Sequence, residues 1–192
     1  HADLHTPYTT PSGNMHGMPL ATAIAEDNME NKAHEPDEKT VNLWNQLKAV
    51  GKINQKVLPE DIVLISLRDF EKEEKFLIEK HGIKVITTNE VRRNGAENVS
   101  RKVLRYLSDC TDIYVSFDVD SLDPTISKGT GTPVNNGLKE REAEDLISKF
   151  MQSRKMCCFE ISEVNPTLDK ENLMAEIAFN ILQRSVNVLM MS

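Results

Sequence analysis

The sequence predicts an α/β protein of three layers, in which helices cover the faces of a mainly parallel sheet. Short apolar runs rich in β-branched residues alternate with longer amphipathic stretches along the 192 residues, as expected for strands and helices of such a sheet. Polar turns separate the runs, and no linker is long enough to divide the chain. We therefore expect a single domain over residues 1–192.

The predicted elements follow from hydrophobic periodicity, taken in chain order. An amphipathic stretch near residues 20–25 predicts a helix, and the polar stretch 27–36 predicts a surface loop. The clearest strands are the short apolar runs at 62–67, 83–87, 113–117 and 157–161. Between and after them, apolar residues at helical spacing predict helices at about 71–80, 96–107, 139–151 and 170–188.

Composition excludes several classes of function. The formal net charge is −7, with no block of Lys or Arg, which argues against nucleic-acid binding. No apolar run approaches the roughly 20 residues of a membrane span. The three cysteines, Cys110, Cys157 and Cys158, fit no zinc spacing and no disulfide framework. We expect them to be reduced and mostly buried in a cytoplasmic protein.

Two carboxylates end the most apolar predicted strand. Asp118 and Asp120 are spaced i, i+2, which an extended backbone projects to the same side. Ligands of open α/β sheets bind outside the carboxyl ends of the strands, so a bound cation explains the pair. The third carboxylate, Asp123, precedes Pro124 and is suited to capping the loop. Taken alone, the motif would be better explained as a strand that ends in a solvated acidic turn.

The first three residues, His1-Ala2-Asp3, repeat this spacing with one imidazole and one carboxylate. That mixture of ligands suits manganese or another borderline divalent ion. A lone pair of this kind would be better explained as structural. Because two strand ends each offer a ligand pair, the sequence predicts a two-metal site, with ions about 3.5–4 Å apart.

Several longer stretches resemble the arginases, which belong to the dinuclear manganese ureohydrolases. Residues 1–3 with 9–17 (Thr-Thr-Pro-Ser-Gly-Asn-Met-His-Gly) resemble the first arginase signature, and residues 116–124 (Ser-Phe-Asp-Val-Asp-Ser-Leu-Asp-Pro) resemble the second. Gly-Thr-Gly-Thr-Pro at 129–133, Glu-Val-Asn-Pro at 163–166 and Leu-Arg-Asp at 67–69 match further motifs in family order. The resemblance covers nearly the whole chain and implies an arginase/deacetylase-like sheet.

The resemblance also implies a set of metal and catalytic residues. Two Mn²⁺ ions would be bound by His1, Asp3, Asp118 and Asp120, with Asp118 bridging them. Asp120 would also accept a hydrogen bond from the attacking hydroxide, and His16 would shuttle protons to the leaving amine. The implied reaction is hydrolysis of L-arginine to L-ornithine and urea.

Substrate contacts are implied at further positions. Ser12 and Asn14 would hold the α-carboxylate, and Thr132 would line the pocket. Glu163, expected just past an apolar strand, would pair with the guanidinium, which a carboxylate binds in a planar fork. Glu71 aligns with the family residue that contacts the α-amino group, and His5 and Glu74 are the other implied substrate-binding residues. His5 stands where arginases commonly have asparagine, and Glu71 where they commonly have aspartate.

The family pattern also has residues upstream of this chain. An aspartate two residues before His1 and an earlier histidine ligand are not among the 192 residues. We therefore expect an arginase-like domain whose sheet is incomplete at the N-terminus, and an isolated chain that is impaired or inactive. By resemblance, the parent protein should form trimers or hexamers.

Other functions remain open on the sequence alone. Another guanidino hydrolase, such as an agmatinase or a formiminoglutamase, would share the metal ligands without the amino-acid clamp. The hydroxyl and amide donors of residues 12–17 favour arginase, because they would be left unpaired by a decarboxylated substrate. A zinc deacetylase would not need this ligand set together with Glu163. A non-catalytic fragment that serves in assembly is the alternative from another class.

Overall fold

The structure of the chain is a computed structural model that describes residues 1–126 and 128–191. The chain forms two compact units, each described by itself below. Unit 1 comprises residues 1–64 and 69–85, and unit 2 comprises residues 65–68 and 86 onward. The single domain over residues 1–192 stays a prediction.

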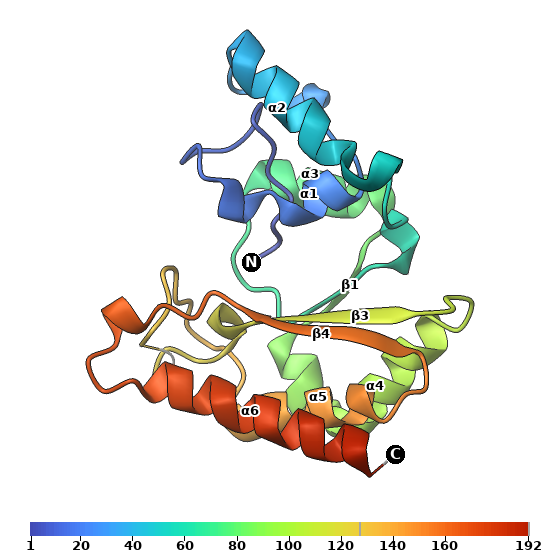
Figure 1. Ribbon diagram of the computed structural model, residues 1–192, viewed down its shortest axis with the longest axis vertical. Coiled ribbons are helices and arrows are strands. Elements are labelled where there is room, and N and C mark those ends of the chain that lie inside the picture. The colour runs from blue at the N-terminus through green and yellow to red at the C-terminus, as the bar shows by residue number, and fades with distance from the viewer. Residues whose placement is uncertain (127, 192) are drawn as a thin grey trace. The chain divides into compact units, whose positions relative to one another are not determined.

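Helices and strands alternate along the chain as the α/β class requires (Figure 1). The strands are β1 (Val63–Ile65), β2 (Lys84–Ile86), β3 (Ile113–Asp118) and β4 (Met156–Ser162). The helices are α1 (Pro19–Ala23), α2 (Glu38–Lys48), α3 (Lys72–His81), α4 (Thr88–Tyr106), α5 (Glu140–Met151) and α6 (Leu173–Met190). β1 pairs with β2, and β3 pairs with β4.

Unit 1 packs its helices around a small apolar core. Met18, Ala21 and Trp44 are buried together, with Tyr8 and Leu47 packed against them. The Trp44 indole N–H donates to Asp27 Oδ1 at 2.6 Å, so the buried ring keeps a partner for its one polar atom. The sequence analysis predicted no helix at residues 38–48. That helix begins at Asp37, whose carboxylate accepts from Thr40 N at 2.7 Å.

Two other helix starts are set by capping boxes, in which two side chains and two backbone N–H groups satisfy one another. Glu71 and Glu74 form such a box at the start of α3, which ends at Gly82 with a left-handed backbone. Thr87 and Glu90 form another at the start of α4. The prediction for α4 was short because this cap starts the helix at Thr88, while Gly95 breaks the helical backbone inside it.

Unit 2 contains a parallel pair of strands covered by helices. β3 and β4 run parallel, with Phe117 opposite Ile161 and Asp118 opposite Ser162. The helices α4, α5 and α6 lie on one side of this pair in the ribbon (Figure 1). The guanidinium of Arg184 joins α6 to α5 by donating to Glu144 at 2.8 Å. The predicted α/β class and parallel pairing are confirmed here.

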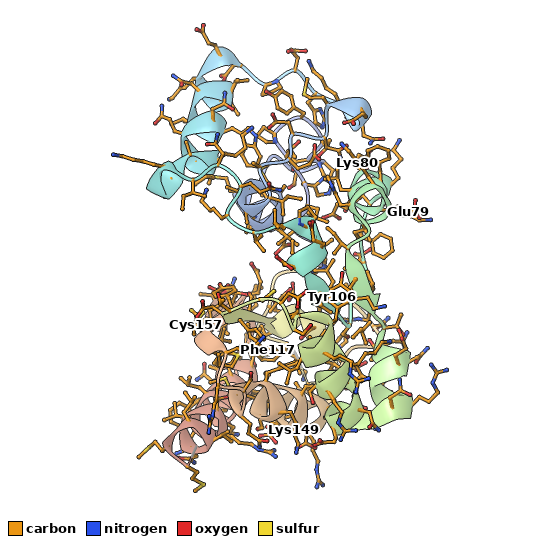
Figure 2. The ribbon with its side chains drawn as sticks, turned by 90° about the vertical axis from the view of Figure 1, so that its right-hand side faces the viewer. Glu79, Lys80, Tyr106, Phe117, Lys149 and Cys157 are labelled. Carbon is orange, nitrogen blue, oxygen red and sulfur yellow. The ribbon has the colours of Figure 1, made fainter. Side chains whose placement is uncertain are left out.

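The other face of β3 and β4 is polar and open. Tyr114, opposite Cys158, is 54% exposed, and the Ser116 hydroxyl donates to Glu160 across the strands at 2.7 Å. All three cysteines are free thiols in the structure, but the prediction that they are mostly buried is wrong. Cys157 and Cys158 are exposed; strand side chains project from the faces of a sheet, and Cys158 lies opposite Tyr114 on the exposed face of the pair. Figure 2 shows Cys157 at the margin of unit 2, while Phe117 lies inside it.

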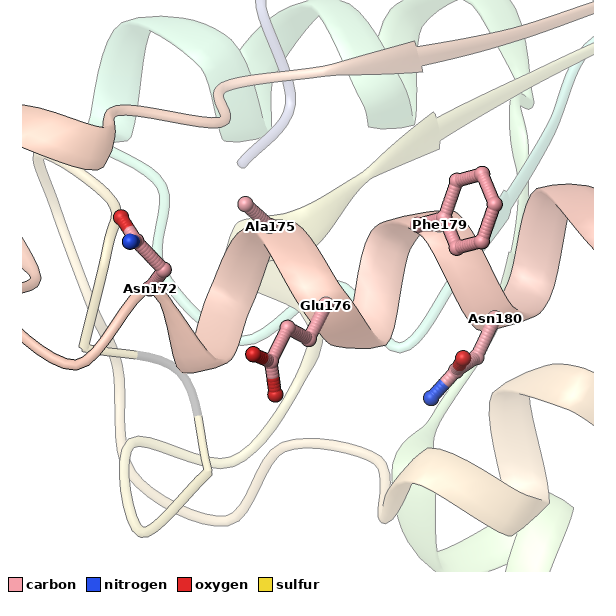
Figure 3. A pocket seen from close by; sticks show the side chains of 5 residues that line it. All are labelled: Asn172, Ala175, Glu176, Phe179 and Asn180. Carbon is pink, nitrogen blue, oxygen red and sulfur yellow. The ribbon is translucent and has the colours of Figure 1, made fainter.

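The outer face of α6 bears a shallow depression (Figure 3). The residues that line it are Asn172, Ala175, Glu176, Phe179 and Asn180. None of them is a predicted site residue, so the depression does not mark the site inferred from the sequence. Within the described residues, no helix is both long and apolar enough to span a membrane.

Candidate metal centre and substrate-binding residues

The predicted ligands Asp118 and Asp120 lie at the carboxyl end of β3, as the sequence predicted. Asp118 is the last residue of the strand, and its Oδ1 accepts from Asp120 N at 2.7 Å. This bond turns the chain sharply, so Asp120 enters a short 3-10 turn, Val119–Ser121. Two carboxylates are thereby held at one strand end, with Asp120 only 2% exposed.

Hydroxyl donors hold the buried carboxylate of Asp120. Thr130 donates to its Oδ1, and Thr132 donates to its Oδ2 at 2.7 Å. A carboxylate oxygen has more than one lone pair, so each oxygen can accept a hydroxyl and still face a cation. The prediction for Thr132 was contact with substrate, and the structure shows it against a metal-ligand candidate. Thr130 was not predicted, although it lies in the same Gly-Thr-Gly-Thr-Pro motif.

Glu163 leaves β4 at the same edge of the sheet. Because Asp118 is opposite Ser162 in a parallel pair, Glu163 begins just beyond the end of both strands. Asn165 N donates to Gly129 O at 2.6 Å, so the segment after β4 is tied to the segment that carries the threonines. Unit 2 therefore brings Asp118, Asp120, Thr132 and Glu163 to one strand edge.

Three residues at strand ends or in the first motif have a left-handed backbone conformation, which residues other than glycine rarely adopt. These are Asp3 (φ 55°), Ser66 (φ 65°) and Glu163 (φ 64°). Such conformations cost of the order of 1–3 kcal/mol and concentrate at functional sites. Asp3 and Glu163 were predicted site residues, but the conformation does not by itself mark the site, because other residues share it, namely Ala25, Asn28, Lys52, Asn136 and Asn172.

Unit 1 carries the other predicted ligands on its first segment. Asp3 is fixed through its backbone, because its carbonyl accepts from Leu20 N at 3.0 Å and Ala21 N at 3.2 Å at the start of α1. The amide of His5 donates to Gly17 O at 3.0 Å. These bonds give the segment that begins at His1 a defined path.

His5, Glu71 and Glu74 lie together in unit 1, with potential ligand atoms within 4.8 Å of one another. His5 Nε2 lies 3.0 Å from Glu71 Oε2, and its Nδ1 lies 3.3 Å from Thr9 Oγ1. The resemblance implied substrate contacts at each of these positions, and the structure places the three residues side by side. In place of the family's amide, His5 presents an imidazole that already contacts Glu71.

Glu74 is the buried member of the group. Its oxygens accept from Leu4 N at 3.0 Å and from Glu71 N at 3.1 Å. Burial raises the pKa of Glu74 to about 7, and its hydrogen bond with Glu71 acts in the same direction. The pKa of Glu71 is lowered by the hydrogen bonds that its carboxylate receives from Glu74 and His5. Glu71, the more exposed of the two, is therefore the anion that a ligand can reach.

The remaining predicted residues lie on an exposed loop of unit 1. Ser12, Asn14 and His16 are exposed, and the Ser12 hydroxyl oxygen accepts from Asn14 N at 3.2 Å. Gly13 between them has a left-handed backbone, with φ of 75°. The loop thus leaves a hydroxyl, an amide and an imidazole available to a ligand.

The donor set fits the metal that the resemblance implies. Carboxylates and imidazoles are the ligands of Mn²⁺ and similar ions, and the Asp118–Asp120 turn holds two such oxygens at a strand end. Thr130 and Thr132 donate to the two oxygens of the buried Asp120 carboxylate, and each oxygen keeps a lone pair with which it can bind a cation.

The fold and the site define an α/β protein with candidate metal ligands at its strand ends, and comparisons with known proteins give its family. Residues 1–186 match the Arginase family. The arginase of Brevibacillus brevis is 36% identical over 183 residues, covering 95% of this chain and 56% of that protein. The arginase of Bacillus caldovelox is 35% identical over the same shares. Its solved structure superimposes with a TM-score of 0.82 at 34% identity, covering 96% of this chain and 57% of that one.

The chain belongs to the arginase family. It spans about 56% of the length of the curated relatives that it matches.

Proposed function

We propose that the protein carrying this chain hydrolyses L-arginine to L-ornithine and urea with two manganese ions. Family membership supports the reaction class, and the strand edge that gathers Asp118, Asp120 and Glu163 is the observation that carries the proposal. The proposed metal ligands are His1, Asp3, Asp118 and Asp120. Bound divalent ions supply a water of lowered pKa and polarise the substrate.

The residues of the chain would perform the rest of the reaction. Glu163 would orient the guanidinium by a charge-assisted fork of hydrogen bonds. Attack by water on the guanidinium carbon breaks its bond to the side-chain nitrogen that becomes the ornithine amine. His16 would donate the proton that this leaving nitrogen needs, because histidine exchanges protons near neutral pH.

The other end of the substrate would select arginine. Ser12 and Asn14 would donate to the α-carboxylate, and Glu71, the ionised member of its group, would accept from the α-ammonium. Thr132 would line the pocket while it holds Asp120. A substrate without the carboxylate leaves the first two donors unpaired, which penalises agmatine relative to arginine.

The rate of urea release tests this proposal. The Mn²⁺-activated protein that carries this chain is assayed with L-arginine and agmatine in parallel, as wild type, Glu163→Gln and Glu160→Gln. Removing one partner of a charged pair costs upwards of about 2 kcal/mol, so Glu163→Gln should lose about 30-fold or more in kcat/KM. Glu160, which lies on the open face of β4 and bonds to Ser116, is the matched control and should keep wild-type turnover.

Two outcomes would change the assignment. Turnover of agmatine in preference to arginine would replace the substrate and remove the roles of Ser12 and Asn14. Equal activity of the two glutamine variants would remove Glu163 from the reaction. The trimeric or hexameric assembly and the cytoplasmic location stay predictions.

A further inference from the structure

Arg68 is the member of the Leu67-Arg68-Asp69 motif that the proposed reaction does not use. It lies in unit 2, three residues after the end of β1, and donates to backbone carbonyls of three separate segments. Nη1 donates to Ser66 O at 2.8 Å, and Nη2 donates to Asp120 O at 2.7 Å and to Val134 O at 3.0 Å. A single guanidinium thus ties the end of β1 to two distant parts of the chain.

The Arg68 guanidinium also donates to the carbonyls of the residues that follow Asp120 and Val134. Nη1 also reaches Ser121 O at 3.1 Å, and Nε reaches Asn135 O at 3.2 Å. The guanidinium therefore holds two consecutive carbonyls on each side, at 120–121 and at 134–135. Its planar set of five N–H donors suits this task, whereas an ammonium has three donors around one point.

The held segments flank the residues that contact the Asp120 carboxylate. Thr130 and Thr132 precede Val134 by a few residues, and both donate to Asp120. Holding Asp120 and Val134 by the same group fixes the start of the turn relative to the segment that carries the threonines. The position of the Asp120 oxygens therefore depends on Arg68, which holds the backbone carbonyl of the same residue.

Arg68 lies near three carboxylates that favour its charged form. Burial lowers the pKa of the Arg68 guanidinium, while the carboxylates of Asp118, Asp123 and Asp120 raise it. Arginine stays protonated under these conditions. Because the cation also faces the carboxylates, it could act through its charge alone, and the experiment must separate charge from geometry.

We propose that Arg68 is a positioning residue that clamps the Asp120 turn to the segment at 134–135 and so holds the metal-ligand carboxylate in place. The inference rests on the proposed function for its metal. The clamp itself belongs to the chain and can be measured in metal-free protein.

The test compares Arg68→Lys and Arg68→Gln with Arg92→Gln. Arg92 is a matched control, because it donates to Gly137 O at 2.5 Å and to Glu142 in the same unit, without contacting the Asp120 turn. Hydrogen–deuterium exchange is followed at the amides of Asp120 and Leu122, which donate to Asp118 Oδ1 at 2.7 Å and to Val119 O at 3.0 Å. Mn²⁺ affinity is measured by paramagnetic resonance titration of each variant.

If Arg68 is a clamp, both Arg68 variants lose protection of these amides, and Arg92→Gln keeps it. Their Mn²⁺ affinity falls about 10–100-fold, as for other groups that orient metal ligands. Wild-type affinity in Arg68→Lys, with tighter Mn²⁺ binding in Arg68→Gln, would overturn the clamp in favour of a charge effect. Unchanged exchange in both Arg68 variants would also overturn it. If the wild type binds no Mn²⁺, the proposed function fails, and the exchange result alone decides the clamp.

Discussion

The buried carboxyl of Glu74 should make unit 1 less stable as the pH rises through neutrality. In the fold the pKa of Glu74 is raised to about 7, chiefly by burial, whereas the ordinary value is 4.5. Between these two values the folded chain holds a proton that the unfolded chain has lost. The free energy of unfolding therefore falls as pH rises across this window and levels off above it.

The size of this effect follows from the two pKa values. A difference from 4.5 to about 7 corresponds to about 3 kcal/mol, at about 1.4 kcal/mol per pH unit. Between pH 5 and pH 8 most of it, about 2–3 kcal/mol, should be lost. Glu71 does not add to the slope there, because its pKa is lowered and it is ionised in both states.

Glu74→Gln removes the ionisation while keeping the shape of the protonated side chain. The variant should match the wild type below the ordinary pKa of 4.5 and exceed its free energy of unfolding by about 3 kcal/mol at pH 8. Urea unfolding followed by tryptophan fluorescence is the assay. The sequence holds one tryptophan, and Trp44 is buried in unit 1, so the signal reports the unit that carries Glu74.

Glu79→Gln is the matched control, because Glu79 is an exposed residue of the same helix (Figure 2). It should reproduce the wild-type pH dependence. The reasoning is refuted if Glu74→Gln loses as much stability between pH 5 and pH 8 as the wild type does.

Two further substitutions test the packing of unit 2. A Cβ on Gly129 would lie 2.8 Å from Met174 Cβ and 3.0 Å from Asp169 Cβ, so Gly129→Ala should lower the free energy of unfolding by about 1–3 kcal/mol. A Cβ on Gly131 would meet open space, so chemical denaturation should show no comparable loss of unfolding free energy for Gly131→Ala. Thr87→Ala removes the side-chain cap of α4 and should cost about 1 kcal/mol, and a cost near zero would contradict the capping assignment.

The sequence was sufficient to predict the helices and strands whose hydrophobic pattern is local. β3 was predicted because its run of apolar residues ends in two acids, and α5 because its apolar residues recur at helical spacing. α2 was missed, since the helix exposes most of its residues and buries Trp44 alone. The cysteines of β4 were misjudged because residue type gives average burial, while actual burial depends on the face of the sheet from which a side chain projects.

In the candidate site, too, some residues could be predicted from local sequence and others could not. Asp118 and Asp120 were predicted from their spacing at a strand end, but the extended backbone expected for the pair is wrong for Asp120, which lies in the 3-10 turn Val119–Ser121. Thr130 and Arg68 were not predicted, because their contacts depend on tertiary positions that no local period encodes. The His5–Glu71 contact likewise joins residues 66 positions apart, and only the resemblance indicated that they belong together.

The central claim is that the strand-end carboxylates of this arginase-family chain bind manganese. Titration of the protein that carries this chain with Mn²⁺, followed by paramagnetic resonance, tests it most directly when wild type is compared with Asp118→Asn and Asp123→Asn. Asp123 is the control, because its carboxylate accepts from Thr125 N at 3.1 Å and serves the turn. We predict saturable binding that Asp118→Asn abolishes and Asp123→Asn retains. Absence of saturable binding in the wild type, or equal binding by Asp118→Asn, would contradict the account.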